Sequence, residues 1–223
     1  MPLLSEKDRA YLQDMFNKQL VEPVKILYFF RLIGCDYCDD TRMILKEVSE
    51  LSDKIEVEEH NVEEHKELAE KYGVDKVPAI IILRGREGDR DYGIRFFGIP
   101  SGYEFTSLIE AIIYVSRGET DLQEETKKEL SKIDRPVHIQ VFITPTCPYC
   151  PRAVVLAHKM AIENENIKAD MIESIEFPDL ANHYRVYAVP KIVVNDVVEF
   201  EGALPEPQFL EKVMEVLERT EAQ

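Results

Sequence analysis

The sequence has 223 residues, of which 45% are hydrophobic and 31% are charged, so it is long enough for one or two domains with packed cores. Its apolar runs stay below the ~18 residues that a membrane-spanning helix requires, so we expect no contact with a membrane. The formal net charge of −16 repels phosphate backbones and argues against nucleic acid as a partner.

The start of the chain and its composition predict a cellular location. The chain begins Met-Pro-Leu-Leu-Ser and lacks the basic start, apolar stretch and cleavage site of a secretory signal, so we expect a cytoplasmic protein. Many charged residues and no Trp are typical of a thermophile. Intracellular proteins of hyperthermophiles are an exception to the rule that cytosolic proteins lack disulfides.

The predicted elements of the first half begin with a helix over residues 5–20, capped by Ser5, with Leu12 and Phe16 on its apolar face. A continuous apolar strand over residues 26–30 then runs into a C-x-x-C motif. The remaining elements of this half are a helix to about residue 51, a strand over 55–59, a helix ending at Tyr72, a buried strand over 77–83, a polar hairpin over 84–91, a strand closing at Gly98 and a helix over 101–117.

The second half repeats this order. A charged segment over residues 118–133 predicts a connecting helix, and a strand over 139–143 runs into a second C-x-x-C. The elements that follow are a helix to about residue 164, a strand over 167–172, a helix ending at Tyr184, a strand over 189–195, a tight Asn195-Asp196 turn, a strand closing at Gly202 and a helix over 205–218.

Two motifs keep the same spacing in both halves. Cys35-Asp36-Tyr37-Cys38 is followed by Val77-Pro78, and Cys147-Pro148-Tyr149-Cys150 is followed by Val189-Pro190. Both the first cysteines and the prolines are 112 positions apart. Because this offset has no gap, we predict two domains of the same fold, over residues 1–118 and 119–223, each with its own dithiol.

A C-x-x-C at a junction between strand and helix favours redox chemistry. Unpaired N–H groups and the macrodipole at a helix start stabilise a thiolate, which is the attacking species in disulfide exchange. Cys35 and Cys147 are therefore the candidate nucleophiles, and Cys38 and Cys150 are placed to resolve a mixed disulfide.

With these motifs the chain resembles the thioredoxin fold family, and as a whole the tandem, glutaredoxin-like protein disulfide oxidoreductases of thermophilic archaea and bacteria. The resemblance covers about residues 24–221 and includes Gly98 and Gly202. It implies an α/β protein with two tandem thioredoxin-like domains, each a mixed central sheet flanked by helices, with an extra N-terminal helix. It also implies exchange of disulfides in protein substrates, often with electrons from a thioredoxin-reductase-like flavoenzyme. We expect no cofactor and no metal.

The resemblance also assigns substrate-binding residues. In the family the proline is cis and lies against the dithiol, and the residue before it offers backbone hydrogen bonds to an extended substrate. By position, Pro78 with Val77 and Pro190 with Val189 take these roles. Tyr37 and Tyr149 are either substrate contacts or packing residues, and the sequence favours neither.

The chain departs from thioredoxins at the proton acceptor. Thioredoxins carry a buried Asp six residues before the first cysteine, whereas Phe29 and Val141 stand at those positions here. Glu59 and Glu173, near the ends of strands, are the substitutes that the sequence offers.

Other interpretations of the four cysteines remain open. Four thiolates could bind one structural zinc ion in a non-catalytic module, or the cysteines could form inert disulfides. A third alternative is an electron-relay module between a flavoprotein reductase and a peroxiredoxin. The net direction of exchange does not follow from the residues.

Overall fold

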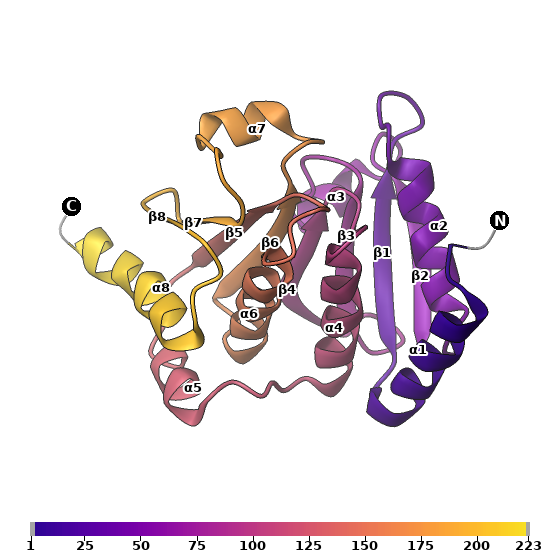
Figure 1. Cartoon of the computed structure of the whole chain (residues 1–223), viewed down its shortest axis with the longest axis horizontal. Coiled ribbons are helices and arrows are strands. Elements are labelled where there is room, and N and C mark those ends of the chain that lie inside the picture. The colour runs from indigo at the N-terminus through magenta and orange to yellow at the C-terminus, as the bar shows by residue number, and fades with distance from the viewer. Residues whose placement is uncertain (1–2, 222–223) are drawn as a thin grey trace.

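The computed structural model of the chain describes residues 3–221, in which eight strands form one sheet with the order β2-β1-β3-β4-β6-β5-β7-β8 (Figure 1). The strands are β1 (Val24–Phe30), β2 (Ile55–Asn61), β3 (Ala79–Arg84), β4 (Arg90–Phe97), β5 (Val137–Ile143), β6 (Ile167–Glu173), β7 (Lys191–Val194) and β8 (Val198–Glu201). The helices are α1 (Glu6–Gln19), α2 (Cys38–Ser49), α3 (Lys66–Lys71), α4 (Glu104–Arg117), α5 (Glu124–Leu130), α6 (Cys150–Glu163), α7 (Pro178–His183) and α8 (Glu206–Glu221).

The repeated order of elements confirms the predicted fold class. Strand, helix, strand, helix, strand, strand, helix runs from β1 to α4 and again from β5 to α8. The connecting helix α5 is shorter than predicted, because it begins only at Glu124. The strands after the Val-Pro pairs begin at Ala79 and Lys191, one residue beyond each proline. The boundary between residues 118 and 119 stays a prediction.

One parallel strand pair joins the sheets of the two halves. Strand β4 pairs with β6, from Ile94 opposite Ala169 to Phe97 opposite Ile172. Because β1 runs parallel to β4 through two antiparallel steps, and β5 runs parallel to β6, both β1 and β5 point the same way. The loops that follow β1 and β5 therefore lie at the same edge of the sheet.

The sheet is covered on both faces, which explains why its strands are continuous apolar runs. In β1, Ile26 and Tyr28 belong to the larger core, and Leu27 and Phe29 belong to the smaller core on the opposite face. Helices α1, α2, α4, α5, α6 and α8 contribute buried residues to the larger core, whereas α3 and α7 pack on the smaller one. Figure 1 shows α4 and α6 beside each other in front of the sheet.

The helix predicted over residues 5–20 is present as α1, with the expected N-terminal cap and the expected apolar face. The Ser5 hydroxyl accepts a hydrogen bond from the backbone N–H of Asp8 (3.1 Å), and Leu12 and Phe16 are buried.

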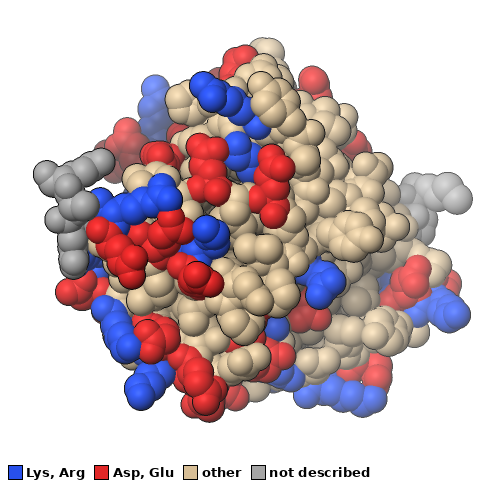
Figure 2. Space-filling view, turned by 60° about the vertical axis from the view of Figure 1, so that its left-hand side comes forward, with Lys and Arg blue, Asp and Glu red and all other residues tan. Residues whose placement is uncertain are grey.

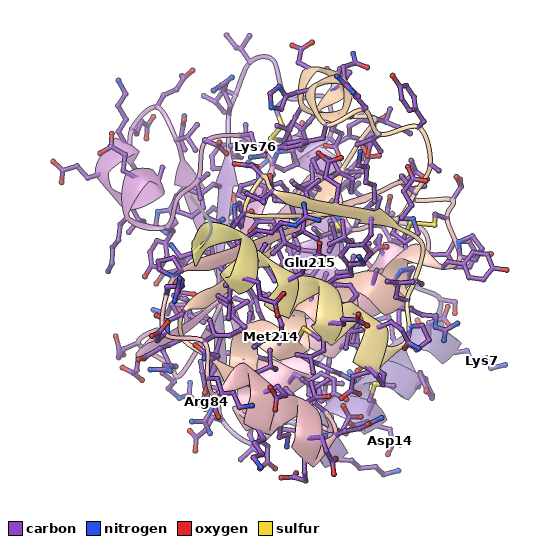
Figure 3. All side chains as sticks on the ribbon, turned by 90° about the vertical axis from the view of Figure 1, so that its left-hand side faces the viewer. Lys7, Asp14, Lys76, Arg84, Met214 and Glu215 are labelled. Atoms are coloured by element: carbon purple, nitrogen blue, oxygen red, sulfur yellow. A yellow bond between two sulfur atoms is a disulfide. The ribbon has the colours of Figure 1, made fainter. Side chains whose placement is uncertain are left out.

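At the other end of the molecule, Glu215 on α8 pairs with Lys212 and Arg219 along the exposed side of that helix (Figure 3).

The surface is charged but mixed in sign. Figure 2 shows Lys and Arg side chains interspersed with Asp and Glu on the face turned toward the viewer, with neutral surface between them. Among the helices of residues 3–221, none is long and apolar enough to cross a membrane.

Candidate active sites

The first dithiol lies between β1 and α2. Cys35 and Cys38 form a disulfide, with their Cα atoms 5.5 Å apart. Cys38 is the first residue of α2 and is buried, whereas Cys35 is partly exposed in the loop before the helix. Of the two cysteines, the predicted nucleophile Cys35 is therefore the more exposed.

A buried tyrosine fixes the start of α2. The Tyr28 hydroxyl, on β1, donates a hydrogen bond to the Cys38 carbonyl oxygen (2.5 Å). Burial of this phenol raises the pKa of Tyr28, so it remains a hydrogen-bond donor across the physiological range. The Thr41 hydroxyl donates to the Tyr37 carbonyl oxygen (2.7 Å), which closes the first helical turn.

The second dithiol lies between β5 and α6 in the same arrangement. Cys147 and Cys150 form a disulfide, and both are buried. The backbone N–H of Cys150 points to the Cys147 sulfur (3.2 Å), so the start of α6 directs a donor at the predicted nucleophile. The same sulfur lies 3.8 Å from the Val189 carbonyl oxygen, which brings the Val-Pro pair against the dithiol.

Both Val-Pro peptides are cis, as the resemblance implied. The backbone N–H of Gly98 donates to the Pro78 carbonyl oxygen, and that of Gly202 donates to the Pro190 carbonyl oxygen, each at 2.9 Å. The two late glycines thus hold equivalent places beside the two prolines.

The two motif tyrosines point to solvent. Tyr37 is 40% exposed and Tyr149 is 62% exposed. An aromatic ring that packs inside a core is far less exposed, so neither ring is a core residue, and contact with a substrate stays a prediction.

The two carboxyl groups that the sequence offered as proton acceptors are engaged elsewhere. Glu59 accepts a hydrogen bond from the Arg42 guanidinium (2.8 Å) on the outer side of α2. Glu173 is buried at the end of β6, where its two oxygens accept the backbone N–H groups of Ile175 (3.1 Å) and Glu176 (2.9 Å).

Sequence reasoning missed a buried carboxyl group at the start of α4. Glu104 is fully buried, one of its oxygens bonds to the Ser107 hydroxyl (2.5 Å), and the other has no partner within residues 3–221. Burial raises the pKa of Glu104 to about 7. Tyr103 donates its backbone N–H to the Pro145 carbonyl oxygen (3.0 Å), which sets the start of α4 against the loop that leads to Cys147.

A second missed carboxyl group is Glu176, in the loop after β6. One of its oxygens accepts the backbone N–H of Ile99 (2.7 Å). Burial, with the negative charges of Glu173 and Asp36, raises the pKa of Glu176 to about 8. Neither Glu104 nor Glu176 lies near a motif in the sequence, because each belongs to the half of the chain opposite the dithiol it approaches.

The arrangement does not allow the four cysteines to share one zinc ion. Strands β3, β4 and β6 separate β1 from β5, which places the two motifs about 19 Å apart at the usual strand spacing. Within the described part of the chain, no group of three or more His, Cys, Asp or Glu residues could hold a metal ion.

The fold and the two dithiols define a tandem thioredoxin-fold enzyme of dithiol–disulfide exchange. The chain belongs to the thioredoxin domain family, which matches it twice, over residues 24–110 and 137–215. These matches confirm the resemblance stated above.

Two solved structures carry the same tandem arrangement. A protein disulfide oxidoreductase from Aeropyrum pernix is 34% identical, with a TM-score of 0.85 over 94% of this chain and 91% of that chain. The NTD_N/C domain of alkylhydroperoxide reductase AhpF from Enterococcus faecalis is 25% identical, with a TM-score of 0.87 over 94% of this chain and 99% of that chain.

Curated relatives are longer proteins. An NADH dehydrogenase of Bacillus subtilis is 29% identical over 72% of this chain, and an alkyl hydroperoxide reductase of Pseudomonas aeruginosa is 30% identical over 55% of it. The matches span only 28% and 24% of those two relatives. With both C-x-x-C motifs intact, the chain is a thiol–disulfide oxidoreductase.

Proposed function

We propose that this enzyme exchanges disulfides in protein substrates, with Cys35 and Cys147 as nucleophiles and Cys38 and Cys150 as resolving cysteines. The observation that carries the proposal is the placement of the second dithiol. The Cys150 N–H at the start of α6 points to the Cys147 sulfur, where it stabilises a thiolate, and the same sulfur lies 3.8 Å from the Val189 carbonyl oxygen, so the thiolate forms beside the Val-Pro peptide.

The exchange proceeds in two displacements. The thiolate of Cys147 attacks one sulfur of the substrate disulfide, so that a mixed disulfide forms and one substrate thiolate leaves. The Cys150 thiolate then attacks Cys147, which releases the second substrate thiolate and leaves an enzyme disulfide. Two electrons pass to the substrate, whose two thiolates take up protons. Glu104 is the proposed proton-exchanging group of this site: it is buried at the start of α4, which contacts the loop that leads to Cys147, and its pKa of about 7 lets it carry either state near neutrality.

The test is reduction of an oxidised protein substrate with dithiothreitol as the electron source. Replacing both Cys35 and Cys147 by Ser removes both nucleophiles, and turnover should fall to the rate of dithiothreitol alone. Substantial turnover by the folded double variant would refute the assignment. The variant with Cys38 and Cys150 changed to Ala should instead accumulate mixed disulfides with the substrate, which mass spectrometry detects.

A second candidate is electron relay from a flavoprotein reductase to a peroxiredoxin. It rests on the similarity to the alkyl hydroperoxide reductases of Enterococcus faecalis and Pseudomonas aeruginosa. Purified chain, added to a thioredoxin-reductase-like flavoenzyme and a peroxiredoxin, should then support NADH- or NADPH-dependent consumption of peroxide. If oxidised protein substrates are reduced and the peroxide is not consumed, the first proposal alone stands.

A further inference from the structure

The two active sites differ in the space beside their prolines. Gly98 and Gly202 occupy equivalent positions, because each donates its N–H to the carbonyl oxygen of the neighbouring cis-proline, and each has a positive φ, of 97° and 89°. The space above each glycine therefore borders the Val-Pro peptide that faces the dithiol.

That space is filled at the first site and open at the second. A Cβ atom built on Gly98 would lie 2.5 Å from the Glu173 Cβ and 2.6 Å from a carboxyl oxygen of Glu176. A Cβ atom built on Gly202 would meet nothing within 4 Å. The sequence does not predict this difference, because each glycine directly follows the equivalent strand of its half.

The topology of the sheet explains the difference. Strand β4 ends at Phe97, just before Gly98, and pairs with β6 of the second half, so Glu173 at the end of β6 and Glu176 in the following loop lie over the glycine. Strand β8, which precedes Gly202, is the last strand of the sheet and pairs only with β7 (Figure 1). Within residues 3–221, no further strand follows β8 to supply a covering loop.

Glu176 is held in place over the first site. Its carboxyl group accepts the Ile99 N–H (2.7 Å), and its own backbone N–H donates to the buried Glu173 carboxyl group (2.9 Å). With a pKa raised by burial to about 8, Glu176 is largely uncharged at neutral pH and stays in this position without a cationic partner.

The backbone beside each dithiol is free to bind an extended chain. Within residues 3–221, neither Val77 nor Val189 uses its N–H or C=O in a backbone hydrogen bond. Free backbone groups at the margin of a sheet pair with an added strand, and such pairing gives affinity without selecting a sequence. Of the two glycines beside these Val-Pro pairs, Gly202 is the one with nothing within 4 Å of an added Cβ atom.

We propose that Cys147–Cys150 takes disulfides in extended polypeptides along the open side of Pro190 and Gly202, whereas Glu176 closes the equivalent side of the first site, so that Cys35–Cys38 exchanges with small disulfides. This inference rests on the proposed function, since both sites perform the same two-electron exchange. Glu176 is then a specificity-determining residue, supplied by the half of the chain that does not carry the dithiol it controls.

The test compares single-site enzymes, one with Cys147 and Cys150 changed to Ser and the other with Cys35 and Cys38 changed to Ser. Each is reduced and mixed with an excess of bis(2-hydroxyethyl) disulfide or of a linear peptide that contains one disulfide. The second-order rate constant for oxidation of the enzyme is measured by acid quench and alkylation. Loss of one or two backbone hydrogen bonds predicts a peptide-to-small-disulfide ratio about tenfold lower at the first site.

Two variants of Glu176 distinguish the effect of its side-chain volume on substrate preference from the effect of its charge. In the first-site enzyme, Glu176→Ala should raise the ratio several-fold toward that of the second site, because it removes the carboxyl group over Gly98 and leaves only the Glu173 Cβ there. Glu176→Gln keeps the volume and should leave the ratio low. Equal ratios at the two sites, or the same ratio for the Ala and Gln variants, would overturn the inference.

A change in the substrate gives a second measurement that needs no variant of Glu176. N-methylation of the peptide residues that flank the attacked cysteine removes the backbone N–H donors. It should lower the rate constant at the second site about tenfold and leave the first site unaffected. If neither enzyme reacts with bis(2-hydroxyethyl) disulfide, the proposed function itself fails; if both react and N-methylation changes neither rate, only the division between the sites is wrong.

Discussion

Arg95 and Asp170 connect the two halves of the chain through a buried, bidentate ion pair. The guanidinium of Arg95, on β4, donates to both carboxyl oxygens of Asp170, on β6, at 2.7 and 2.9 Å. The Arg95 side chain is 9% exposed and that of Asp170 is 3% exposed. His138 lies 2.6 Å from the same carboxyl group. Burial alone would raise the pKa of Asp170, but the His138 hydrogen bond and the charge of Arg95 outweigh it and lower that pKa.

Arg95→Met should destabilise the protein by about 3–5 kcal/mol, because it leaves the Asp170 carboxylate buried without its cation. The free energy of unfolding in urea measures the loss. The double variant Arg95→Met/Asp170→Leu is the control and should be more stable than Arg95→Met alone, since it removes the uncompensated charge. A single variant that loses less than about 1 kcal/mol would show that the pair does not hold the halves together.

Glu104 should make stability depend on pH. Its pKa is about 7 in the folded protein against an ordinary value of 4.5. As pH rises from 4.5 to 7 the unfolded chain loses this proton first, so stability falls through that window and is level above it. Relative to the wild type, Glu104→Gln should lose less stability between pH 5 and pH 8, by on the order of 3 kcal/mol.

Urea unfolding at pH 5 and pH 8 measures this difference. Glu110→Gln, on the same helix, is the matched control and should follow the wild-type profile. Identical pH profiles for the wild type and Glu104→Gln would contradict burial of the carboxyl group as the cause.

The two nucleophiles should differ, with Cys147 the more acidic thiol and its disulfide the more oxidising. Asp36 and Asp40 are exposed beside Cys35, where negative charge disfavours a thiolate. At the second site the Cys150 N–H points to the Cys147 sulfur (3.2 Å), and Arg152 adds a cation in the first turn of α6. A more stable thiolate favours the reduced form, so the Cys147–Cys150 pair should have the less negative potential.

The measurement is the pH dependence of alkylation in single-site variants, with the other pair changed to Ser. Asp36→Asn should lower the pKa of Cys35, and this effect should shrink at high salt because the charge is exposed. A Cys35 pKa at or below that of Cys147 would reverse the ranking.

Gly102 should be required at the contact between the first half and the second site. It has a φ of +59°, and a Cβ atom there would collide with the Pro145 carbonyl oxygen, in the loop before Cys147. Gly102→Ala should therefore destabilise the protein by more than about 2 kcal/mol and slow exchange at Cys147. Gly34→Ala is the control, with a φ of +75° and nothing within 4 Å of its added Cβ. Equal costs for the two variants would mean that the contact with Pro145 is irrelevant.

The sequence by itself determined the elements, the repeat and the two dithiols. Apolar runs and C-x-x-C spacing are properties of short segments of sequence. Because the offset between the motifs is constant, each element assigned in one half could also be assigned at the matching residues of the other half. The Ser5 cap and the tight Asn195-Asp196 turn, whose two residues have positive φ, were predicted from the residues, whereas the cis Val-Pro peptides were implied only by the family resemblance.

Only the tertiary structure decided how the halves join and how their sites differ. The pairing of β4 with β6 turns two sheets into one and brings together Arg95 and Asp170, which are 75 positions apart. The same pairing sets Glu176 over Gly98 and leaves Gly202 open. A sequence repeat predicts two equivalent active sites. The side chains that cover each site, however, depend on whether its last strand lies inside the sheet or at its edge. The sequence of one half does not determine that position.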